Sequence, residues 1–582
     1  MRTGFGFGTA GLAIVALTST CQVLIGYEDA VLDDAGVSGN SCDIDGMKNG
    51  SETGTDCGGS CAPCPDGEGC AVGTDCQSHM CVDGNCVAAG CADQAQAACY
   101  SGPDGTRGVG ACQDGIKVCD AAGRFGPCEG DLKPKVERCS NAADENCDSF
   151  DCVEQARLLG DSDIQEPHAV AVDSDGNSYV VGSFQGAIEL DSDTLVEVGG
   201  GDAFVVKLDA DAKTVWAKQF GSQSAEAATA TAIDSAGNII VAGWSDGPID
   251  FGGAPVPSGI FVAKLSAAGV HLWSKSFGGA AGSAVNDLAV MPGDDDVLCG
   301  GHFLGTINFG DGGMDANAGL LGLGTDGFIA KIRGTDGSGK ASDGSWAKVF
   351  GDDEAQSLRN VRAGPAGTVV VSGNFVGSMN LTGVALTSSG QHDIFMAKLS
   401  STGSSIWQKR FGDGQDQTAT GLAIDSNGAA LVAGWFAGTI QFDVPSHTAP
   451  PGTKKMFLAK YATGGTPEWS KELGNAEGTV TAAFDAEGNA LLTGGFTGAV
   501  DLGGGVLEAD GTDVFIAKLS SSGSIVWSKR FGDSSNQFAR AIGVAPSGES
   551  VIVGVADGAI NFGTGPLSAA GGWDIFVARF GL

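Results

Sequence analysis

The 582-residue sequence predicts an all-β fold in which about 430 residues form repeats. A unit of about sixty residues recurs seven times, and its most persistent part is a glycine, three residues, a second glycine, and two apolar residues at alternate positions. Repeats of roughly this period are typical of solenoids and propellers. The pattern occurs at Gly182/Gly186/Ile188/Leu190, Gly243/Gly247/Ile249/Phe251, Gly301/Gly305/Ile307/Phe309, Gly373/Gly377/Met379/Leu381, Gly434/Gly438/Ile440/Phe442, Gly494/Gly498/Val500/Leu502 and Gly554/Gly558/Ile560/Phe562.

Each unit contains four short segments in which apolar residues alternate with polar or small ones. In the second unit these segments are 227–233, 238–245, 260–266 and 271–278, and Gly, Ser, Asp and Asn separate them. This is the signature of strands and turns. Four antiparallel strands per repeat make the blade of a β-propeller, and stacked blades require apolar groups on both faces. We expect Phe261, Ala263 and Leu265 on one face and Val262 on the other.

The two ends of the repeat region predict how the ring closes. Six units end in a strand of the form Trp-x-Lys-x-apolar-Gly, at Trp216, Trp273, Trp346, Trp407, Trp469 and Trp527. The seventh unit stops at Asp574–Leu582, after its third strand, whereas residues 155–161 align with 527–533, with Gln155 in place of the Trp. We therefore predict a monomeric seven-bladed β-propeller over 153–582, closed by an N-terminal strand that leaves no open sheet edge.

The turns and strands resemble those of the bacterial seven-bladed β-propeller repeat of surface lipoproteins. Its Asp-x-x-Gly-Asn turn is complete at 173–177, 234–238 and 485–489, and it is followed by Phe-Val-x-Lys-Leu and Trp-x-Lys-x-Phe-Gly strands. The turn is least preserved at 292–296, in the third unit. The resemblance implies a propeller and an extracytoplasmic location, but propellers serve many unrelated functions.

The N-terminus predicts export. Residues 1–20 form an apolar segment after Arg2, which is typical of a secretory signal and too short for a confident transmembrane helix, and 21–41 follow as a linker. Cys21 resembles the cysteine of a lipoprotein cleavage box, although Leu17 lies four residues before it rather than three. We expect Cys21 to be lipidated, which gives a stable membrane anchor; ordinary secretion is the alternative. The expected location is an outer-membrane lipoprotein or a secreted protein of a Gram-negative bacterium.

The cysteines predict a disulfide-rich region before the propeller. Sixteen of the 18 fall in two groups of eight, which we assign to modules 42–90 and 91–152 of a stalk. An even number of closely spaced cysteines in an exported protein indicates disulfides, with the pairing left open. A zinc site at Cys61-x2-Cys64 is the alternative, and Cys299 is expected to be a buried, inert thiol. The sixteen are Cys42, Cys57, Cys61, Cys64, Cys70, Cys76, Cys81, Cys86, Cys91, Cys99, Cys112, Cys119, Cys128, Cys139, Cys147 and Cys152.

One acidic segment is a candidate metal site. Asp144, Asn146, Asp148 and Asp151 lie around Cys147 and resemble a metal-binding repeat of bacterial surface proteins. Oxygen ligands at alternate positions suit calcium. The alternative is a solvated acidic turn, and we expect no other cofactor.

The charge of the chain excludes one class of partner. A net charge of −38 argues against nucleic acid, which needs clustered Lys and Arg to neutralise phosphates. Of the 24 Lys and Arg from residue 153 onward, fourteen occupy two fixed positions of the repeat rather than a basic patch. These are Lys207, Lys264, Lys331, Lys398, Lys460, Lys518, Arg579, Arg157, Lys218, Lys275, Lys348, Lys409, Lys471 and Lys529.

The sequence predicts no catalytic residues. Gly243-Trp-Ser245-Asp-Gly247 matches the Gly-x-Ser-x-Gly pattern of hydrolases, but that motif needs a strand-to-helix turn and here it occupies a repeat position. Trp244 and Trp435 are candidates either for stacking a ligand or for blade packing. We expect a non-catalytic surface protein that binds a protein or glycan through its propeller loops. A secreted propeller enzyme acting on polysaccharide is the alternative.

Overall fold

The computed structural model describes most of the repeat region and parts of the cysteine-rich region. The described residues are 57, 61–65, 67–77, 81–86, 94–103, 106–119, 125–135, 153–191, 193–316, 324–442, 445–475, 477–502, 505–563 and 565–581. They form two compact units, one ending at Cys99 and including Ile116–Glu129, and the other made of Tyr100–Gly115 and the residues from Gly130 onward. Among the helices described, none is long and apolar enough to cross a membrane.

The first unit is held together by disulfides rather than by a large apolar core. Its elements are short: η1 (Gly73–Asp75), the paired strands β1 (Cys81–Val82) and β2 (Asn85–Cys86), and the paired strands β3 (Gln96–Cys99) and β4 (Gly115–Val118). Its buried apolar cluster is made of cysteines. Disulfides stabilise such a unit by about 2–4 kcal/mol each, largely by constraining the unfolded chain.

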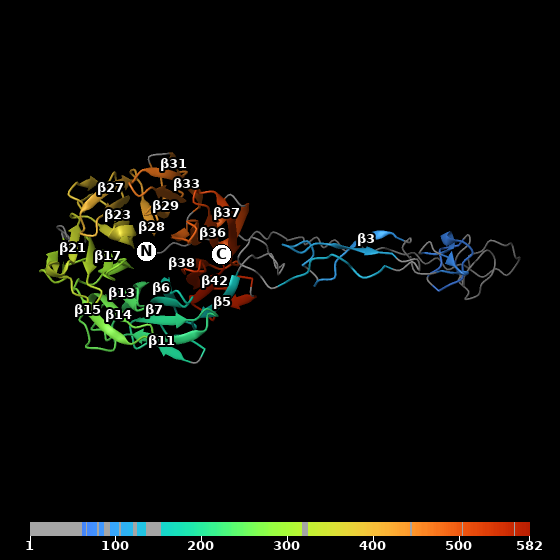
Figure 1. Ribbon diagram of the computed structural model, residues 1–582, viewed down its shortest axis with the longest axis horizontal. Coiled ribbons are helices and arrows are strands. Elements are labelled where there is room, and N and C mark those ends of the chain that lie inside the picture. Colours follow the sequence, from blue (N-terminus) through green and yellow to red (C-terminus); the bar gives the residue numbers. More distant parts are fainter. Residues whose placement is uncertain are drawn as a thin grey trace, which may run out of the picture. The chain divides into compact units, whose positions relative to one another are not determined.

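The second unit contains seven four-stranded antiparallel sheets, which are the blades of a propeller (Figure 1). The strands of each blade are given from the innermost outward. Blade 1 consists of β6 (Gln165–Val172), β7 (Ser178–Phe184), β10 (Asp202–Leu208) and β11 (Thr214–Phe220), and blade 2 of β12 (Glu226–Ile233), β13 (Ile239–Ser245), β14 (Gly259–Leu265) and β15 (His271–Ser276). Blade 3 consists of β16 (Ala284–Val290), β17 (Val297–Phe303), β20 (Asp326–Ile332) and β21 (Trp346–Phe350), and blade 4 of β22 (Gln356–Ala363), β23 (Val369–Phe375), β26 (Asp393–Leu399) and β27 (Ser405–Phe411). Blade 5 consists of β28 (Gln417–Ile424), β29 (Ala430–Phe436), β32 (Lys455–Tyr461) and β33 (Pro467–Asn475), and blade 6 of β34 (Glu477–Phe484), β35 (Ala490–Asp501), β36 (Val506–Leu519) and β37 (Ile525–Phe531). Blade 7 consists of β38 (Gln537–Val544), β39 (Ser550–Ala556), β42 (Asp574–Phe580) and β5 (Val153–Leu159).

Short elements connect the strands of most blades. Hairpins between the second and third strands are β8 (Ala187–Glu189) with β9 (Thr194–Val196), β18 (Thr306–Ile307) with β19 (Met314–Asp315), β24 (Ser378–Met379) with β25 (Leu386–Thr387), β30 (Thr439–Gln441) with β31 (Ser446–Thr448), and β40 (Ala559–Asn561) with β41 (Pro566–Ser568). In blade 6 the long strands β35 and β36 continue through this hairpin. Two single-turn 3-10 helices, η2 (Ala341–Asp343) and η3 (Pro365–Gly367), complete the fold.

Strand β5 closes the ring, as the sequence predicts. It pairs antiparallel with β42, and the two strands lie side by side in Figure 1. Gln155 lies opposite Arg579, as Trp527 lies opposite Lys518 in blade 6, so the alignment of Gln155 with the repeated Trp is confirmed in register. The innermost strands β38 and β6 are also in contact. Blade 7 therefore has no unpaired outer edge at β42.

The core lies between neighbouring blades, and both faces of the third strand contribute to it. Phe261, Ala263 and Leu265 pack with blade 1, whereas Val262 packs with blade 3, as expected. The free thiol of Cys299 belongs to the same blade 2–blade 3 cluster, and burial raises its pKa to about 12. Such a thiol stays protonated and unreactive at neutral pH.

The repeated lysines and tryptophans join turns to strands and blades to each other. Lys518 of the third strand forms an ion pair with Asp485 at 3.1 Å, and Lys264 pairs with Asp234 at 2.6 Å, so the Asp of the Asp-x-x-Gly-Asn turn receives the repeated lysine. The indole of Trp469 donates to the carbonyl of Ser521 in the next blade at 3.2 Å. Equivalent bonds are made by Trp216, Trp273, Trp346 and Trp407.

Candidate functional site

The innermost strand of a blade carries an irregularity that the repeat imposes. In six blades one residue of this strand is skipped by the pairing with the second strand, which is a β-bulge. The carbonyl oxygen of Glu166, two residues before the bulge, approaches Gly182 so closely that a Cβ there would lie 2.0 Å from it. The first glycine of the Gly-x3-Gly pattern is therefore required where the bulged strand presses against its neighbour.

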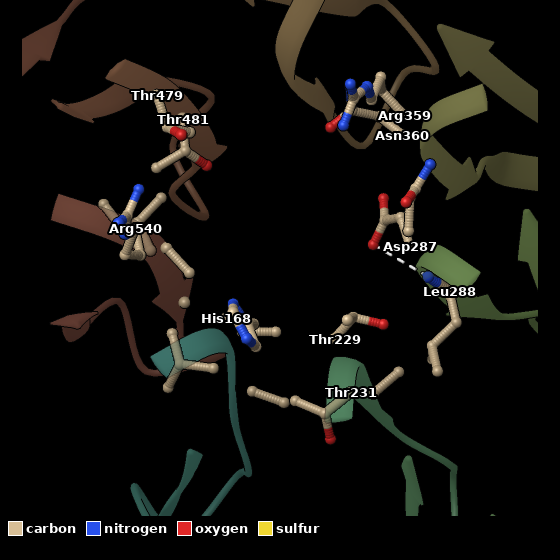
Figure 2. Close-up of a pocket in the computed structure, with 18 of the residues that line it drawn as sticks. His168, Thr229, Thr231, Asp287, Leu288, Arg359, Asn360, Thr479, Thr481 and Arg540 are labelled. Atoms are coloured by element: carbon tan, nitrogen blue, oxygen red, sulfur yellow. Dashed lines mark hydrogen bonds between the residues drawn. The ribbon is translucent and has the colours of Figure 1, made fainter. Parts of the chain in front are cut away.

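The bulges place variable residues around one cavity. The innermost strands enclose a central channel with a cavity of about 880 Å³. Figure 2 shows labelled side chains from several blades arranged around this common opening. All six bulged residues line the cavity, and they are His168, Thr229, Asn286, Arg359, Thr420 and Arg540. The positions that build the blades are nearly uniform from repeat to repeat, whereas these six positions carry four residue types. We call this cavity the channel site.

Between blades 3 and 4, the half-buried carboxylate of Asp287 holds the wall of the channel together. Asp287 forms an ion pair with Arg362 and accepts the backbone N–H of Val361 at 2.8 Å and of Leu288 at 2.9 Å. Figure 2 shows the bond to Leu288. Burial raises the pKa of Asp287, while the positive charge of Arg362 opposes that rise. Because its oxygens are already engaged, Asp287 has a structural role in the wall.

Between blades 7 and 1, a histidine and an arginine face the channel. Arg540 lies 3.5 Å from the carboxylate of Glu166. The Nε2 atom of His168 lies 3.2 Å from the hydroxyl of Ser183 on β7. Burial lowers the pKa of His168, so its imidazole is neutral at pH 7.

Arg359 differs from the other channel arginines. Among the described residues it has no hydrogen-bond or ion-pair partner, and its side chain is exposed to the channel. The surrounding walls lower its pKa by desolvation. Burial, and then the positive charge of Arg359, lower the pKa of His302 to about 4. At neutral pH the guanidinium therefore stands beside an uncharged imidazole.

A second cavity of about 420 Å³ adjoins the same arginine. It is bordered by blades 3, 4 and 5 and shares Arg359, Thr418 and Trp435 with the channel cavity. The half-buried Trp435 thus lies at a cavity wall, with the ammonium of Lys454 3.9 Å from its ring centre. Trp244, the other tryptophan considered from the sequence, borders neither cavity.

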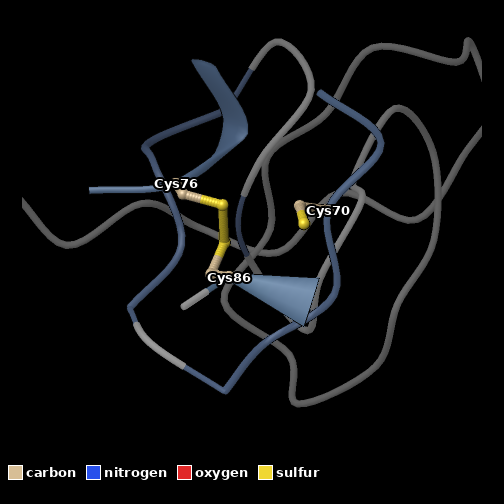
Figure 3. Close-up of side chains that lie close together, drawn as sticks. All are labelled: Cys70, Cys76 and Cys86. Carbon is tan, nitrogen blue, oxygen red and sulfur yellow. A yellow bond between two sulfur atoms is a disulfide. The ribbon is translucent and has the colours of Figure 1, made fainter. Parts of the chain in front are cut away.

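In the cysteine-rich region, the cysteines that the structure describes form disulfides. The pairs Cys57–Cys64, Cys70–Cys81, Cys76–Cys86 and Cys99–Cys128 are present, and Cys61, Cys112 and Cys119 are also disulfide-bonded. The four pairs stay within the two groups of eight. Figure 3 shows Cys70 beside the Cys76–Cys86 bridge. These three sulfur atoms cluster closely, but a sulfur in a disulfide is not the thiolate that binds a metal, and the same reason removes zinc at Cys61 and Cys64.

Several predicted site residues lie outside the described residues. These are Cys21, Cys42, Cys91, Cys139, Cys147 and Cys152, and the calcium candidates Asp144, Asn146, Asp148 and Asp151. Ser245 is described: it is buried at the end of strand β13, which continues into no helix. This geometry is not a nucleophile elbow.

The channel site was missed from the sequence, although a signal for it exists. The sequence alone pointed to no cluster of charged residues, yet six lie around the channel: Glu166, His168, Asp287, Arg359, Arg362 and Arg540. In five blades the bulged residue stands fourteen positions before the first glycine of the Gly-x3-Gly pattern. An alignment of the repeats at this one position would have shown that His168, Arg359 and Arg540 occupy equivalent places in three blades.

Comparison with known proteins does not assign this chain to a family. No protein-family model matches the sequence, and neither does any curated protein. Among solved structures, the Pan2 WD40 domain of Neurospora crassa is 8% identical, with a TM-score of 0.36 over 71% of this chain and 89% of that chain. A luciferin-regenerating enzyme is 10% identical, with a TM-score of 0.29 over 61% and 92%. A protein of unknown function from Bacteroides caccae is 9% identical, with a TM-score of 0.28 over 55% and 93%. Such low similarity transfers no activity, so function is argued from the channel.

Proposed function

We propose that this protein is a non-catalytic, extracytoplasmic binding protein whose propeller holds a ligand at the channel site. One observation carries the proposal: the residues at the bulges vary from blade to blade, while the positions that build the blades are repeated. A variable set of polar groups inside a cavity of about 880 Å³ suits a ligand of moderate size. From the sequence we expected a glycan or protein bound through the propeller loops, and we now propose that the ligand binds in the channel.

The chemistry of the channel carboxylates supports binding rather than catalysis. Asp287 already accepts hydrogen bonds from two backbone N–H groups and pairs with Arg362. Glu166 faces Arg540 across 3.5 Å. General acid–base catalysis requires a group that can reach the substrate and exchange a proton with it. Both carboxylates instead face positive charge supplied by the protein itself.

The disulfides indicate an extracytoplasmic protein, because the cytoplasm keeps thiols reduced. Within that location we propose a lipid anchor at Cys21 in the outer membrane of a Gram-negative bacterium, with the cysteine-rich modules as a stalk and the propeller as a monomer. Cys21→Ser should then move the protein from the membrane fraction to the soluble fraction. Unchanged fractionation, with no acyl group found by mass spectrometry, would contradict the anchor.

An array experiment tests the binding function. The full chain, with its disulfides intact, is applied to glycan and protein arrays beside a variant in which Arg359 and Arg540 are both replaced by Gln. We expect at least one class of component to bind the native chain and to bind the variant at least tenfold more weakly. Binding by neither protein to any component would contradict the proposed function.

A secreted enzyme is the second candidate, and one contact favours it. The Ser183 hydroxyl lies 3.2 Å from Nε2 of His168, and a neutral imidazole can act as a general base. Ser183 is not among the residues that line the channel cavity, which is why this candidate ranks second. Labelling of Ser183 by a fluorophosphonate probe, lost in His168→Gln, would favour the enzyme over the binding protein.

A further inference from the structure

The channel concentrates positive charge in a strongly acidic protein. The whole chain has a net charge of −38, yet the cavity is lined by three arginines and two carboxylates. Low-dielectric walls concentrate the field of such charges within a cleft. At physiological ionic strength the acidic exterior is screened beyond about 8 Å, so the channel presents its own local potential to a ligand.

Ion pairing within the channel accounts for two of the three arginines. Arg362 is paired with Asp287, and Arg540 lies 3.5 Å from Glu166. Arg359 remains as a guanidinium that no described residue hydrogen-bonds or neutralises. Partial desolvation without a partner costs free energy. An anion that enters the channel removes this cost, because an arginine fork can bind a carboxylate or sulfate through two parallel hydrogen bonds.

The neighbours of Arg359 add hydroxyl and aromatic contacts. Thr418 and Trp435 border both cavities together with Arg359. The Thr418 hydroxyl makes no hydrogen bond to another residue in the described part of the chain, so it is available to a ligand. Trp435 is half-buried, with its indole packed against the core between blades 5 and 6 and Lys454 over its ring, and its exposed part provides an apolar surface at the cavity walls. A guanidinium, a hydroxyl and an indole that border the same two cavities suit a ligand that has an anionic group, hydroxyl groups and an apolar ring face.

We propose that Arg359, Thr418 and Trp435 form a binding site for an acidic sugar, with its carboxylate or sulfate group on Arg359. This inference rests on the proposed binding function and names the class of ligand. The hydroxyl of Thr418 hydrogen-bonds a sugar hydroxyl, and Trp435 contacts the apolar face of the sugar ring. A guanidinium binds a carboxylate and a sulfate through the same hydrogen bonds, so probes that carry one or the other are needed to distinguish them.

Calorimetric titration of the full chain tests the site. The probes are trigalacturonate, its methyl ester, which keeps the sugar rings but removes the charge, and a sulfated chondroitin disaccharide. We expect the native protein to bind trigalacturonate or the sulfated disaccharide at least tenfold more tightly than the ester, and more weakly as salt rises. Arg359→Gln should reduce this affinity at least tenfold, and Arg359→Lys by less, because lysine keeps the charge without the fork.

The control is Arg333→Gln, which removes an arginine that pairs with Asp343 outside the channel and should leave binding unchanged. Circular dichroism and thermal unfolding establish that each variant is folded. Equal binding of the ester and the acid, or unchanged binding by Arg359→Gln, would overturn this inference. The proposed binding function still holds in that case if array components bind the native chain and bind the Arg359/Arg540 double variant more weakly. If no array component binds the native chain, both the binding function and the acidic-sugar site are wrong.

Discussion

At the scale of single residues, the most unusual feature is a set of buried aspartates at one position of the repeat. Asp202, Asp393, Asp513 and Asp574 lie at the junction of the blades, and each is at most 2% exposed. In each, the Oδ1 atom has no hydrogen-bond partner among the described residues, and burial raises the pKa. Two of them are compensated by an arginine, Asp393 by Arg410 and Asp513 by Arg530.

Asp574→Asn should stabilise the propeller at pH 7. Asp574 forms no ion pair with a described residue, and the amide removes a buried charge at nearly constant shape, so we expect about 1 kcal/mol from the cost of an unsatisfied buried group. Because the folded-state pKa of Asp574 is raised, its protonation stabilises the folded state below the unfolded pKa of about 3.9, and that contribution is lost as pH rises through the folded pKa. Urea unfolding between pH 4 and 7 should show a weaker fall in stability for the variant.

The matched control for this prediction is Asp393→Asn. It makes the same chemical change at the same position of another blade but deprives Arg410 of its partner, so it should destabilise. Equal effects of the two substitutions would contradict this explanation, which depends on the missing cation at Asp574.

At the scale of elements, each of blades 1 to 5 is fastened to the next by a tryptophan that packs on a glycine. Gly523, with φ +80°, lies in the turn before β37, and a Cβ there would lie 2.9 Å from the ring of Trp469 in the preceding blade. The same indole donates to Ser521 in this turn. The glycine is required both by its left-handed backbone and by the ring that lies against it.

Gly523→Ala and Gly488→Ala separate these two causes. Gly488 has nearly the same φ, +81°, but a Cβ there meets nothing within 4 Å. Both variants should lose about 1 kcal/mol from the left-handed backbone. Gly523→Ala should lose about 1–3 kcal/mol more from the clash with Trp469. Urea unfolding followed by far-ultraviolet circular dichroism measures both, and equal losses would show that the ring contact contributes nothing.

At the scale of the whole molecule, the closing seam departs from the repeat at two linked positions. Strand β5 has Gln155 where the other blades have tryptophan, and the facing turn of blade 1 has Ala212, at φ +57°, where the turns of blades 2 to 6 have glycine. Both residues border a cavity of about 450 Å³ at this seam. The side chain of Arg157 spans the seam instead and donates to the carbonyl of Ala212 at 2.8 Å.

Gln155→Trp and Ala212→Gly should therefore be coupled. The new indole alone meets the methyl group of Ala212 and should destabilise the propeller, whereas together with glycine it can pack as at the other seams. A double-mutant cycle in thermal or urea unfolding should show a favourable coupling of about 1–3 kcal/mol. Additive effects would mean that the seam is not a modified copy of the other blade junctions.

The sequence by itself determined the number of blades, the four strands in each and the closure by β5. Repetition makes this possible, because one turn pattern and one strand pattern, observed seven times, leave little freedom in register. It also indicated that the cysteines form bridges, since their number and spacing report the compartment rather than the pairing. The individual pairs, such as Cys57–Cys64 and Cys99–Cys128, came only from the structure.

The channel site was decided by tertiary structure. His168, Arg359 and Arg540 lie in three different repeats, and nothing local distinguishes them from ordinary strand residues. They line one cavity because a bulge in six of the seven innermost strands turns one residue toward the axis, and because closing the ring places all these bulges around that cavity. The repeats are thus readable from local pattern, whereas the charge that a ligand would meet depends on which residues the closed ring brings together.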